Sequence, residues 1–396
     1  MIKRCSNCSG RLTFDIESQS IKCSSCENSF DMFEIPETDY TDSNNLDTVT
    51  KKMKCNIFIC NSCGAEIIIN DTESSTFCVY CGNSSIVFSR IDNIKRPDAI
   101  IPFKVTREQA EESIRSRLKS GLLIPKEIKN FKIDTLRPIY IPYYISSLEC
   151  YGSAVILSEH VNQDDRHITC RYLRGGRCTF NKITTDASKK LNDNISEHLE
   201  PFNYSGLKTF NENYLLGFYA DSADVTPLEA EKTAKIRAIK LFEKNLIDSV
   251  GEGKEKRIER RNIKTKKLSE AKYVFLPAWF LTFRYNDHPY TILVNGQTGK
   301  IVGGFPWDEA LFIGIFASII LVVSIITTFC LYPFLIVDIF WDAPFNVFFS
   351  EILSLLIIIY FVFAAGVKRM TKFNDSIKRT SETALVSFVK DRQSAN

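Results

Sequence analysis

The chain has 396 residues, of which 44% are hydrophobic and 24% are charged. This composition is typical of globular proteins and excludes a wholly disordered chain. The 50 Lys and Arg residues nearly balance the 47 Asp and Glu residues, so net charge alone does not indicate a polyanion-binding protein. At about 150 residues per domain, the length predicts two or three domains.

Eight cysteines near the N-terminus form two sets with the same spacing. In each set, a CxxC pair is followed by 14 residues and a second CxxC pair. Two such pairs on adjacent hairpins point four thiolates at one tetrahedral zinc ion. We therefore predict two zinc ribbons, at residues 1–35 and 55–90, joined by a polar linker at residues 36–54, each with one structural Zn²⁺ ion. The predicted ligands are Cys5, Cys8, Cys23 and Cys26 in the first ribbon and Cys60, Cys63, Cys78 and Cys81 in the second.

Each predicted ribbon is too short to bury a sufficient core, so metal binding must supply most of its folding free energy. Disulfides and redox-active CxxC pairs are the alternatives. A cytoplasmic N-terminus disfavours disulfides, and redox chemistry does not explain why the paired spacing occurs twice. Four thiolates per ion leave no open coordination position for catalysis.

The predicted ribbons are acidic. Residues 1–90 contain twelve Asp and Glu residues against eight Lys and Arg residues, and the thiolates around each zinc ion add further negative charge. Neutralisation of phosphates dominates the affinity of proteins for nucleic acids. The composition therefore disfavours a nucleic-acid-binding ribbon and favours a protein-docking one.

Residues 98–305 contain a repeated pattern that predicts a duplicated α+β body. Thr106 and Thr226 each stand at an expected helix N-cap, with Gln109 and Glu229 three residues later to complete a capping box. An aromatic strand follows each helix, IYIPYYI in the first unit and VFLPAWFL in the second. The apolar residues at helical spacing are Ala110, Ile114 and Leu118 in the first helix and Ala234, Ala238 and Leu241 in the second.

The body contains no recognisable catalytic motif. A P-loop, a GxSxG nucleophile elbow and an HExxH metal site are all missing from the sequence. We therefore expect no enzymatic activity. The alternative is an enzyme that uses residues of the β-rich part of the body that no motif singles out.

Basic residues gather near the end of the body. Residues 228–272 contain fourteen Lys and Arg residues against eight Asp and Glu residues. A solvated helix face is one explanation, contact with anionic lipid headgroups is a second, and nucleic acid is a third. The candidate residues for contact with an anionic surface are Lys254, Lys256, Arg257, Arg260, Arg261, Lys264, Lys266 and Lys267.

Two apolar runs follow the body. Residues 310–332 carry no charge and residues 347–367 carry one, and each run is long enough to cross a bilayer as a helix. The loop between the runs lacks Lys and Arg, whereas the tail at residues 369–396 is basic near its start. This pattern predicts a transmembrane hairpin at residues 307–368 in the cell membrane, with both termini cytoplasmic.

Several motifs in a fixed order resemble a family of bacterial membrane proteins with N-terminal zinc ribbons of the transcription-factor-IIB type. They are the ribbon at residues 60–81, IPFKVTREQA (101–110), IYIPYYI (139–145), LPAWFLTFRY with VNGQTGKIVGGFPW (276–307), and the C-terminal apolar hairpin. The sequence departs from the family at Tyr143 and Tyr144, where a Trp is usual, and in having a full extra ribbon before the usual one.

The resemblance implies a non-enzymatic membrane platform of envelope-stress systems, partnered with phage-shock-like coiled-coil proteins or SPFH-type scaffold proteins. Some family members are labelled as primosomal helicases, and the missing P-loop argues against that activity here.

Taken together, these patterns predict a multi-domain chain of two small β zinc ribbons, a duplicated α+β body and a two-helix transmembrane hairpin. The predicted function is that of a non-enzymatic, membrane-anchored adaptor that presents its ribbons and body to cytoplasmic proteins. A membrane-tethered nucleic-acid-binding or transcription-related factor is the alternative, although nucleic acid is the less favoured partner.

Overall fold

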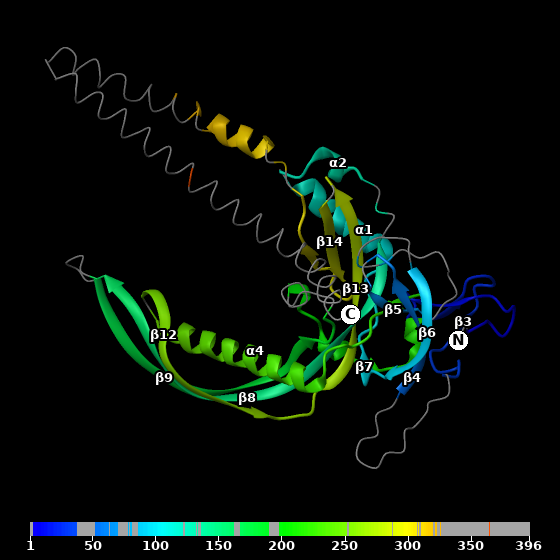
Figure 1. Ribbon diagram of the computed structural model, residues 1–396, viewed down its shortest axis with the longest axis horizontal. Coiled ribbons are helices and arrows are strands. Elements are labelled where there is room, and N and C mark those ends of the chain that lie inside the picture. The colour runs from blue at the N-terminus through cyan, green and yellow to red at the C-terminus, as the bar shows by residue number, and fades with distance from the viewer. Residues whose placement is uncertain are drawn as a thin grey trace.

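The computed structural model of the chain is mostly β-sheet, with 45% strand and 24% helix (Figure 1). A three-stranded sheet lies near the N-terminus, and a twelve-stranded sheet forms the rest of the described strand structure. The structure describes residues 3–37, 52–62, 64–69, 78, 80, 86–121, 123–131, 133, 136–161, 167–189, 198–251, 253–286, 288–306, 308, 310–319, 321, 322, 325 and 364.

The small sheet belongs to the first predicted ribbon. It contains β1 (Leu12–Asp15), β2 (Ser20–Cys23) and β3 (Ser29–Phe30), which pair antiparallel in that order. Buried and half-buried residues alternate along β1 and β2, as expected for strands with one face on a core. The hairpin therefore has an apolar face that must be covered by another part of the molecule.

The large sheet follows the order β10-β7-β13-β8-β11-β5-β4-β6, with β9 and β12 paired to β8, β14 paired to β13 and β15 paired to β14. Its strands are β4 (Lys52–Cys60), β5 (Glu66–Ile69), β6 (Ile86–Lys95), β7 (Ala99–Ile100), β8 (Arg137–Val161), β9 (His167–Asp186), β10 (Lys208–Thr209), β11 (Tyr219–Ala220), β12 (Lys254–Lys267), β13 (Lys272–Tyr285), β14 (His288–Asn295) and β15 (Ile301–Gly303).

Strand β8 runs through two parts of this sheet. Its residues up to Ile145 pair with β13 and β11, whereas residues 148–161 lie between β9 and β12. We call residues 148–161, 167–180 and 254–267, together with helix α4 (Pro227–Asp248), the arm. Figure 1 shows the arm as a curved sheet that extends away from the body, with α4 along the inner side of the curve.

The helices begin where the capping boxes predict. Helix α1 (Arg107–Ser120) starts after Thr106, and α4 starts after Thr226; both boxes are complete. Shorter helical segments are α2 (Lys126–Lys129) and the 3₁₀ turns η1 (Tyr204–Gly206) and η2 (Glu212–Leu215).

The predicted buried face of α1 is confirmed, because Ala110, Ile114 and Leu118 are its buried residues. In α4, Ala234 and Ala238 are buried as predicted, but Leu241 is 43% exposed and Phe242 takes its place in the core. The small alanines let α4 lie close to the sheet of the arm, where they pack with Leu148, Cys150, Ala154 and Ile156 of β8.

Aromatic rings fill the centre of the body. The ring of Phe103 lies 4.9 Å from that of Phe218, 5.1 Å from Tyr140 and 5.3 Å from Trp279, measured between centroids. The indole Nε1 of Trp279 donates a hydrogen bond of 2.9 Å to the carbonyl oxygen of Val105, just before α1. The indole is therefore both packed and hydrogen-bonded, as a buried Trp requires.

The predicted fold class is wrong in its description of the body and of the second ribbon. The strands IYIPYYI and VFLPAWFL pair directly, with Ile141 opposite Leu276, so the two units share one sheet. Both faces of this pair are buried, which explains why both strands are apolar without alternation. Strands β4 and β5 also join this sheet through β11, so the second ribbon is not a separate small β domain.

The predicted transmembrane hairpin is also not borne out. In the described part of the chain, no helix is long and apolar enough to cross a membrane. Of the first predicted span, residues 310–319, 321, 322 and 325 are described, and they are helical. Residues 326–363, which include most of the second run, and the tail at residues 369–396 lie outside the described residues.

Gly296 provides a test of the aromatic core. A Cβ atom at Gly296 would lie 2.6 Å from the Phe103 ring and 2.8 Å from Cβ of Pro277, whereas one at Gly251 would meet nothing within 4 Å. We expect Gly296→Ala to lower the free energy of unfolding by about 1–3 kcal/mol, because the ring must shift. Gly251→Ala is the matched control and should not destabilise the protein. Equal urea midpoints for Gly296→Ala and the wild type would contradict this packing.

Candidate metal centre

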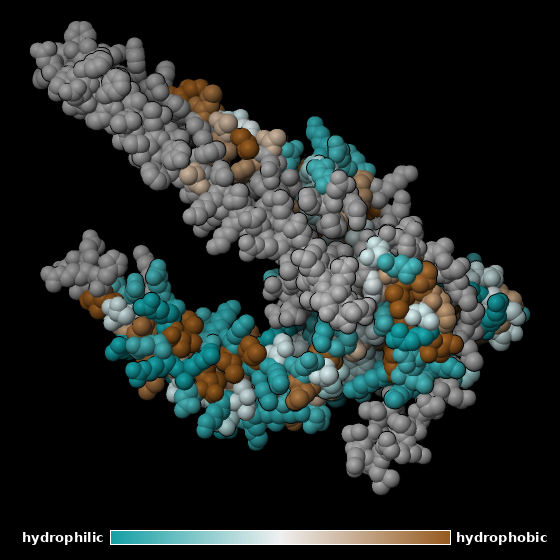
Figure 2. Space-filling model, viewed as in Figure 1, coloured by the Kyte–Doolittle hydropathy of each residue, from teal (hydrophilic) through white to brown (hydrophobic). Residues whose placement is uncertain are grey.

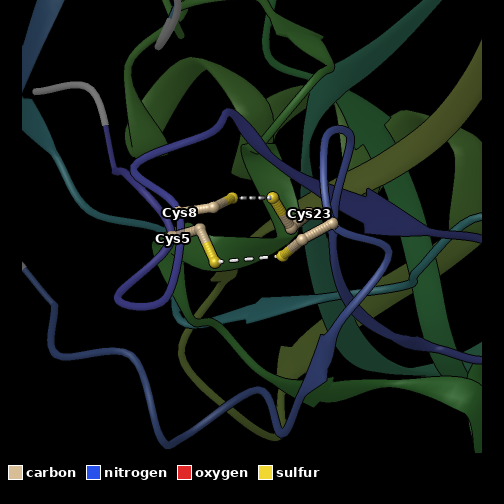
Figure 3. A group of neighbouring side chains, drawn as sticks. Cys5, Cys8 and Cys23 are labelled. Atoms are coloured by element: carbon tan, nitrogen blue, oxygen red, sulfur yellow. Dashed lines mark hydrogen bonds between the residues drawn. The ribbon is translucent and has the colours of Figure 1, made fainter.

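The four cysteines of the first set converge on one point. Their Sγ atoms all lie within 4.8 Å of one another. The Sγ atoms of Cys5 and Cys26 are 3.6 Å apart, and those of Cys8 and Cys23 are 3.4 Å apart (Figure 3). Four sulfurs at about 2.3 Å from a zinc ion in a tetrahedron are about 3.8 Å apart, so this set is close enough to bind a metal ion.

Two backbone turns of the same shape hold these sulfurs. In the first turn, Ser9 N–H donates to the Cys5 carbonyl at 2.8 Å; in the second, Glu27 N–H donates to the Cys23 carbonyl at 3.0 Å. Ser9 and Glu27 have φ values of 58° and 59°, in the left-handed region. Each turn reverses the chain directly after a CxxC pair, which is why both sulfurs of the pair point the same way.

Backbone N–H groups also stabilise charge on the sulfurs. The N–H of Gly10 donates to Cys8 Sγ at 3.4 Å, and that of Ser25 donates to Cys23 Sγ at 3.5 Å. The N–H groups of Cys26 and Ser25 lower the pKa of Cys23 to about 6. Although the Gly10 N–H favours the thiolate of Cys8, the Cys26 and Cys23 thiols raise the pKa of Cys8 to about 12. Cys8 and Cys23 thus hold their protons with different strength, and a bound cation would displace protons from thiols.

The first ribbon is attached to the body through β1. Phe14 N–H donates to the Leu216 carbonyl at 3.0 Å, and its ring lies 5.2 Å from that of Tyr214 and 6.1 Å from that of Phe218. Cys5 and Cys23 belong to the same buried cluster as these rings. The metal site is therefore continuous with the core of the body.

A buried amide strengthens this attachment. Asn213, with no exposed surface, donates from Nδ2 to the carbonyls of Met32 at 2.8 Å and Ile35 at 2.9 Å, and its Oδ1 accepts from Lys3 Nζ at 2.6 Å. These bonds reach both ends of the ribbon. They hold it in one orientation on the η2 segment of the body.

Only part of the second set can be placed. Cys60 and Cys78 are buried, with 0% and 2% exposure, while Cys63 and Cys81 lie outside the described residues. The backbone after Cys60 repeats the turn of the first set, because Gly64 has a φ of 69° and its N–H donates to the Cys60 carbonyl at 2.7 Å.

Sequence reasoning did not find the buried network that fixes this second region. The hydroxyl of Tyr80 donates to Asp221 Oδ2 at 2.7 Å, and the Ser188 hydroxyl donates to the same oxygen at 2.5 Å. Burial and the Asp221 carboxylate raise the pKa of Tyr80 well above its usual value. The only signal in the sequence was the aromatic residue between two predicted ligands, in Cys78-Val-Tyr80-Cys81.

The basic segment Lys254–Lys267 forms strand β12, and not a helix face. Arg261 forms an ion pair with Glu243 of α4, and Lys267 forms ion pairs with Glu231 and Glu270. Lys256 Nζ donates to the carbonyls of Val250 and Gly251. Arg257, Arg260, Lys264 and Lys266 form no such ion pair with a described residue.

Comparison with known proteins adds one relative. The chain matches no family model and, at a significant level, no solved structure. It is similar to "Uncharacterized protein YdjG" of Bacillus subtilis (strain 168), with 27% identity over 311 residues that cover 76% of this chain and 89% of the relative. This similarity is too low to assign a family, and the name of the relative states no activity.

Loss of one ligand tests the metal centre. We expect Cys26→Ser to reduce the metal bound per chain by one equivalent, because three thiolates hold an ion less tightly than four. Cys170→Ser is the matched control, since Cys170 is also half-buried but lies on β9. Metal content measured by atomic emission should fall for the first variant only. Acid should release the metal from the wild type as protons compete for the thiolates, and unchanged metal content in Cys26→Ser would exclude this site.

Proposed function

We propose that this protein is a non-enzymatic adaptor, in which two structural Zn²⁺ ions hold surfaces that dock protein partners. The observation that carries the proposal is the four-thiolate site built into the core of the body. Sulfur separations of 3.4 and 3.6 Å suit a single tetrahedral ion. With four protein ligands, such an ion has no open position for substrate or water, so its role is to shape a surface.

The proposal of a second zinc ion is based on the backbone around Cys60. The turn at Gly64 has the same hydrogen bond and the same left-handed conformation as the turns at Ser9 and Glu27. The sequence supplies Cys63 and Cys81 at the spacing that the first set uses. This repetition supports a second zinc site of the same kind.

An exposed apolar strand supplies the docking surface of this proposal. Strand β6 follows the second set of cysteines, and Val87, Phe88 and Ile91 on it are 45%, 55% and 55% exposed. It stands at one end of the large sheet in the described strand order. Such edges accept an added strand from a partner.

The family resemblance supplies the class of partner. It implies cytoplasmic proteins of the phage-shock-like coiled-coil or SPFH scaffold type, in an envelope-stress or membrane-scaffold system. The adaptor role rests on the metal centre, the body and β6, and it does not require a transmembrane hairpin. Nucleic acid remains the alternative partner, and the acidic composition of the ribbons disfavours it.

Metal analysis tests the zinc assignment. We expect two zinc ions per wild-type chain and one in Cys60→Ala, because that substitution removes a buried ligand from the second set only. Cys55→Ala is the control, since Cys55 is also buried on β4 but its Sγ donates to the Asp92 carbonyl at 3.6 Å. A wild type that holds one zinc ion, or a Cys60→Ala variant that keeps two, would refute the second site.

A pair of matched substitutions tests the docking surface. We expect Ile91→Asp to reduce the recovery of co-purified proteins several-fold after nuclease treatment, because a charge on β6 opposes burial of that strand. Leu228→Asp is the control, since Leu228 is 65% exposed at the start of α4, away from β6. Recovery would be measured by quantitative mass spectrometry. If nuclease removed every co-purified protein from the wild type, the nucleic-acid alternative would replace this proposal.

A further inference from the structure

The arm has two faces of different chemistry. Leu148, Cys150, Ala154 and Ile156 of β8 are buried against α4. Because successive side chains of a strand point to opposite faces, the residues between them lie on the other face, which we call the open face of the arm. In Figure 1 this face lies on the outer side of the curve.

Strand register shows which side chains share the open face. Tyr151 lies between Lys264 of β12 and Arg177 of β9, and Leu157 lies between Arg257 and Arg171. Side chains that are directly opposite on paired strands point to the same face. The same register places Val155 between Arg260 and Leu173, and Glu149 between Lys266 and Thr179.

The register thus divides the cations of β12 between the face that packs on α4 and the open face. Arg261 and Lys267 point toward α4, where Glu243 and Glu231 neutralise them. On the open face, Arg257, Arg260, Lys264 and Lys266 form no ion pair with any described residue. Burial of the strand against α4 therefore does not account for these four charges.

Strand β9 adds further positive charge to this face. Arg171 pairs with Glu259 at 2.9 Å, and Arg177 lies 3.7 Å from Glu149. Together with the four cations of β12, these two arginines make six basic residues on the open face. Three carboxylates share the face with them, those of Glu149, Glu159 and Glu259. The open face thus carries a net positive charge.

Apolar groups lie between these charges. Leu173, opposite Val155, is 70% exposed. The guanidinium carbon of Arg177 lies 5.7 Å from the centre of the Tyr151 ring. Figure 2 shows hydrophilic residues along the arm with hydrophobic ones among them. Cations combined with exposed aliphatic and aromatic groups match the interfacial region of an anionic membrane.

A polynucleotide fits this face less well. The face is on the convex, outer side of the curve (Figure 1). The Arg177 guanidinium already contacts the Tyr151 ring and would compete with a stacked base. The interspersed carboxylates would oppose phosphates held at fixed spacing, whereas lipid headgroups diffuse and can arrange around them.

We propose that the open face of the arm is a binding surface for anionic lipid bilayers. Headgroup phosphates contact Arg257, Arg260, Lys264 and Lys266, and Leu173 enters the interfacial layer. The surface is separate from the docking strand β6 and the zinc sites, so this inference goes beyond the adaptor role and does not depend on it.

Vesicle binding by the full chain tests the inference. The binding of the wild type to vesicles of phosphatidylcholine alone is compared with binding to vesicles that also contain phosphatidylserine, by co-sedimentation at about 0.15 M ionic strength. We expect the wild type to prefer the anionic vesicles. The triple variant Arg257→Glu/Arg260→Glu/Lys264→Glu should partition about a hundredfold more weakly into them, which corresponds to about 1 kcal/mol for each basic residue.

A matched control separates this surface from net charge. Lys104→Glu/Arg117→Glu/Lys119→Glu makes the same change in charge at exposed sites on and before α1, and it should keep the anionic preference. If charge reversal prevents folding, the milder variant Arg257→Gln/Arg260→Gln/Lys264→Gln should still lose the preference, at an unchanged thermal midpoint.

Three results would overturn the proposal. They are equal binding of the wild type to neutral and anionic vesicles, equal loss of preference in the α1 control, and tighter binding to single-stranded or duplex DNA than to anionic vesicles with the same sensitivity to the open-face substitutions. None of these results would affect the zinc content or the recovery of proteins through β6, so the two proposals fail separately.

Discussion

The large sheet is organised by the need of β8 for backbone hydrogen-bond partners along its whole length. This strand has 25 residues, which corresponds to about 80 Å of extended chain. A strand of that length has unpaired N–H and C=O groups along both edges unless other strands cover them. Strands β13 and β11 cover the part of β8 in the body, and β9 and β12 cover the part in the arm. The body and the arm are therefore one continuous hydrogen-bonded sheet.

The first metal centre depends on the body as well as on its own ligands. A free-standing ribbon has little core of its own and is held together by its ion. Here the hairpin also places Phe14 on the aromatic rings of the body, and Asn213 bonds to the end of the ribbon. A bound ion and the body would therefore stabilise the same segment. This double support fixes the orientation of the ribbon surface, which is what a docking role requires.

The arm shows how one run of basic residues acquires two roles. A strand alternates its side chains between faces, so the cations of β12 divide between α4 and the open face. Acidic residues of α4 neutralise the cations that face it. The cations on the open face stay available to an external anion. The same sequence on a helix would have spread its charges around a cylinder and produced no such division.

Short spacings in the sequence were enough to predict several local features. The paired CxxC motifs predicted that Cys5, Cys8, Cys23 and Cys26 lie close enough to bind a metal ion, and the capping boxes at Thr106 and Thr226 marked the starts of α1 and α4. These features need only residues that are close in the chain. Spacing alone could not show that Phe242, and not Leu241, lies in the core, because both residues follow Ala238 by about one helical turn.

Which strands lie side by side is a property of the folded chain. The two aromatic strands IYIPYYI and VFLPAWFL became neighbours in one sheet, and β4 and β5 joined that sheet through β11. The basic segment became a strand because β8 offered it an edge, although charged residues at nearly every position hide the two-residue period in its sequence. Strand pairing joins residues far apart in the chain, so local pattern does not determine it.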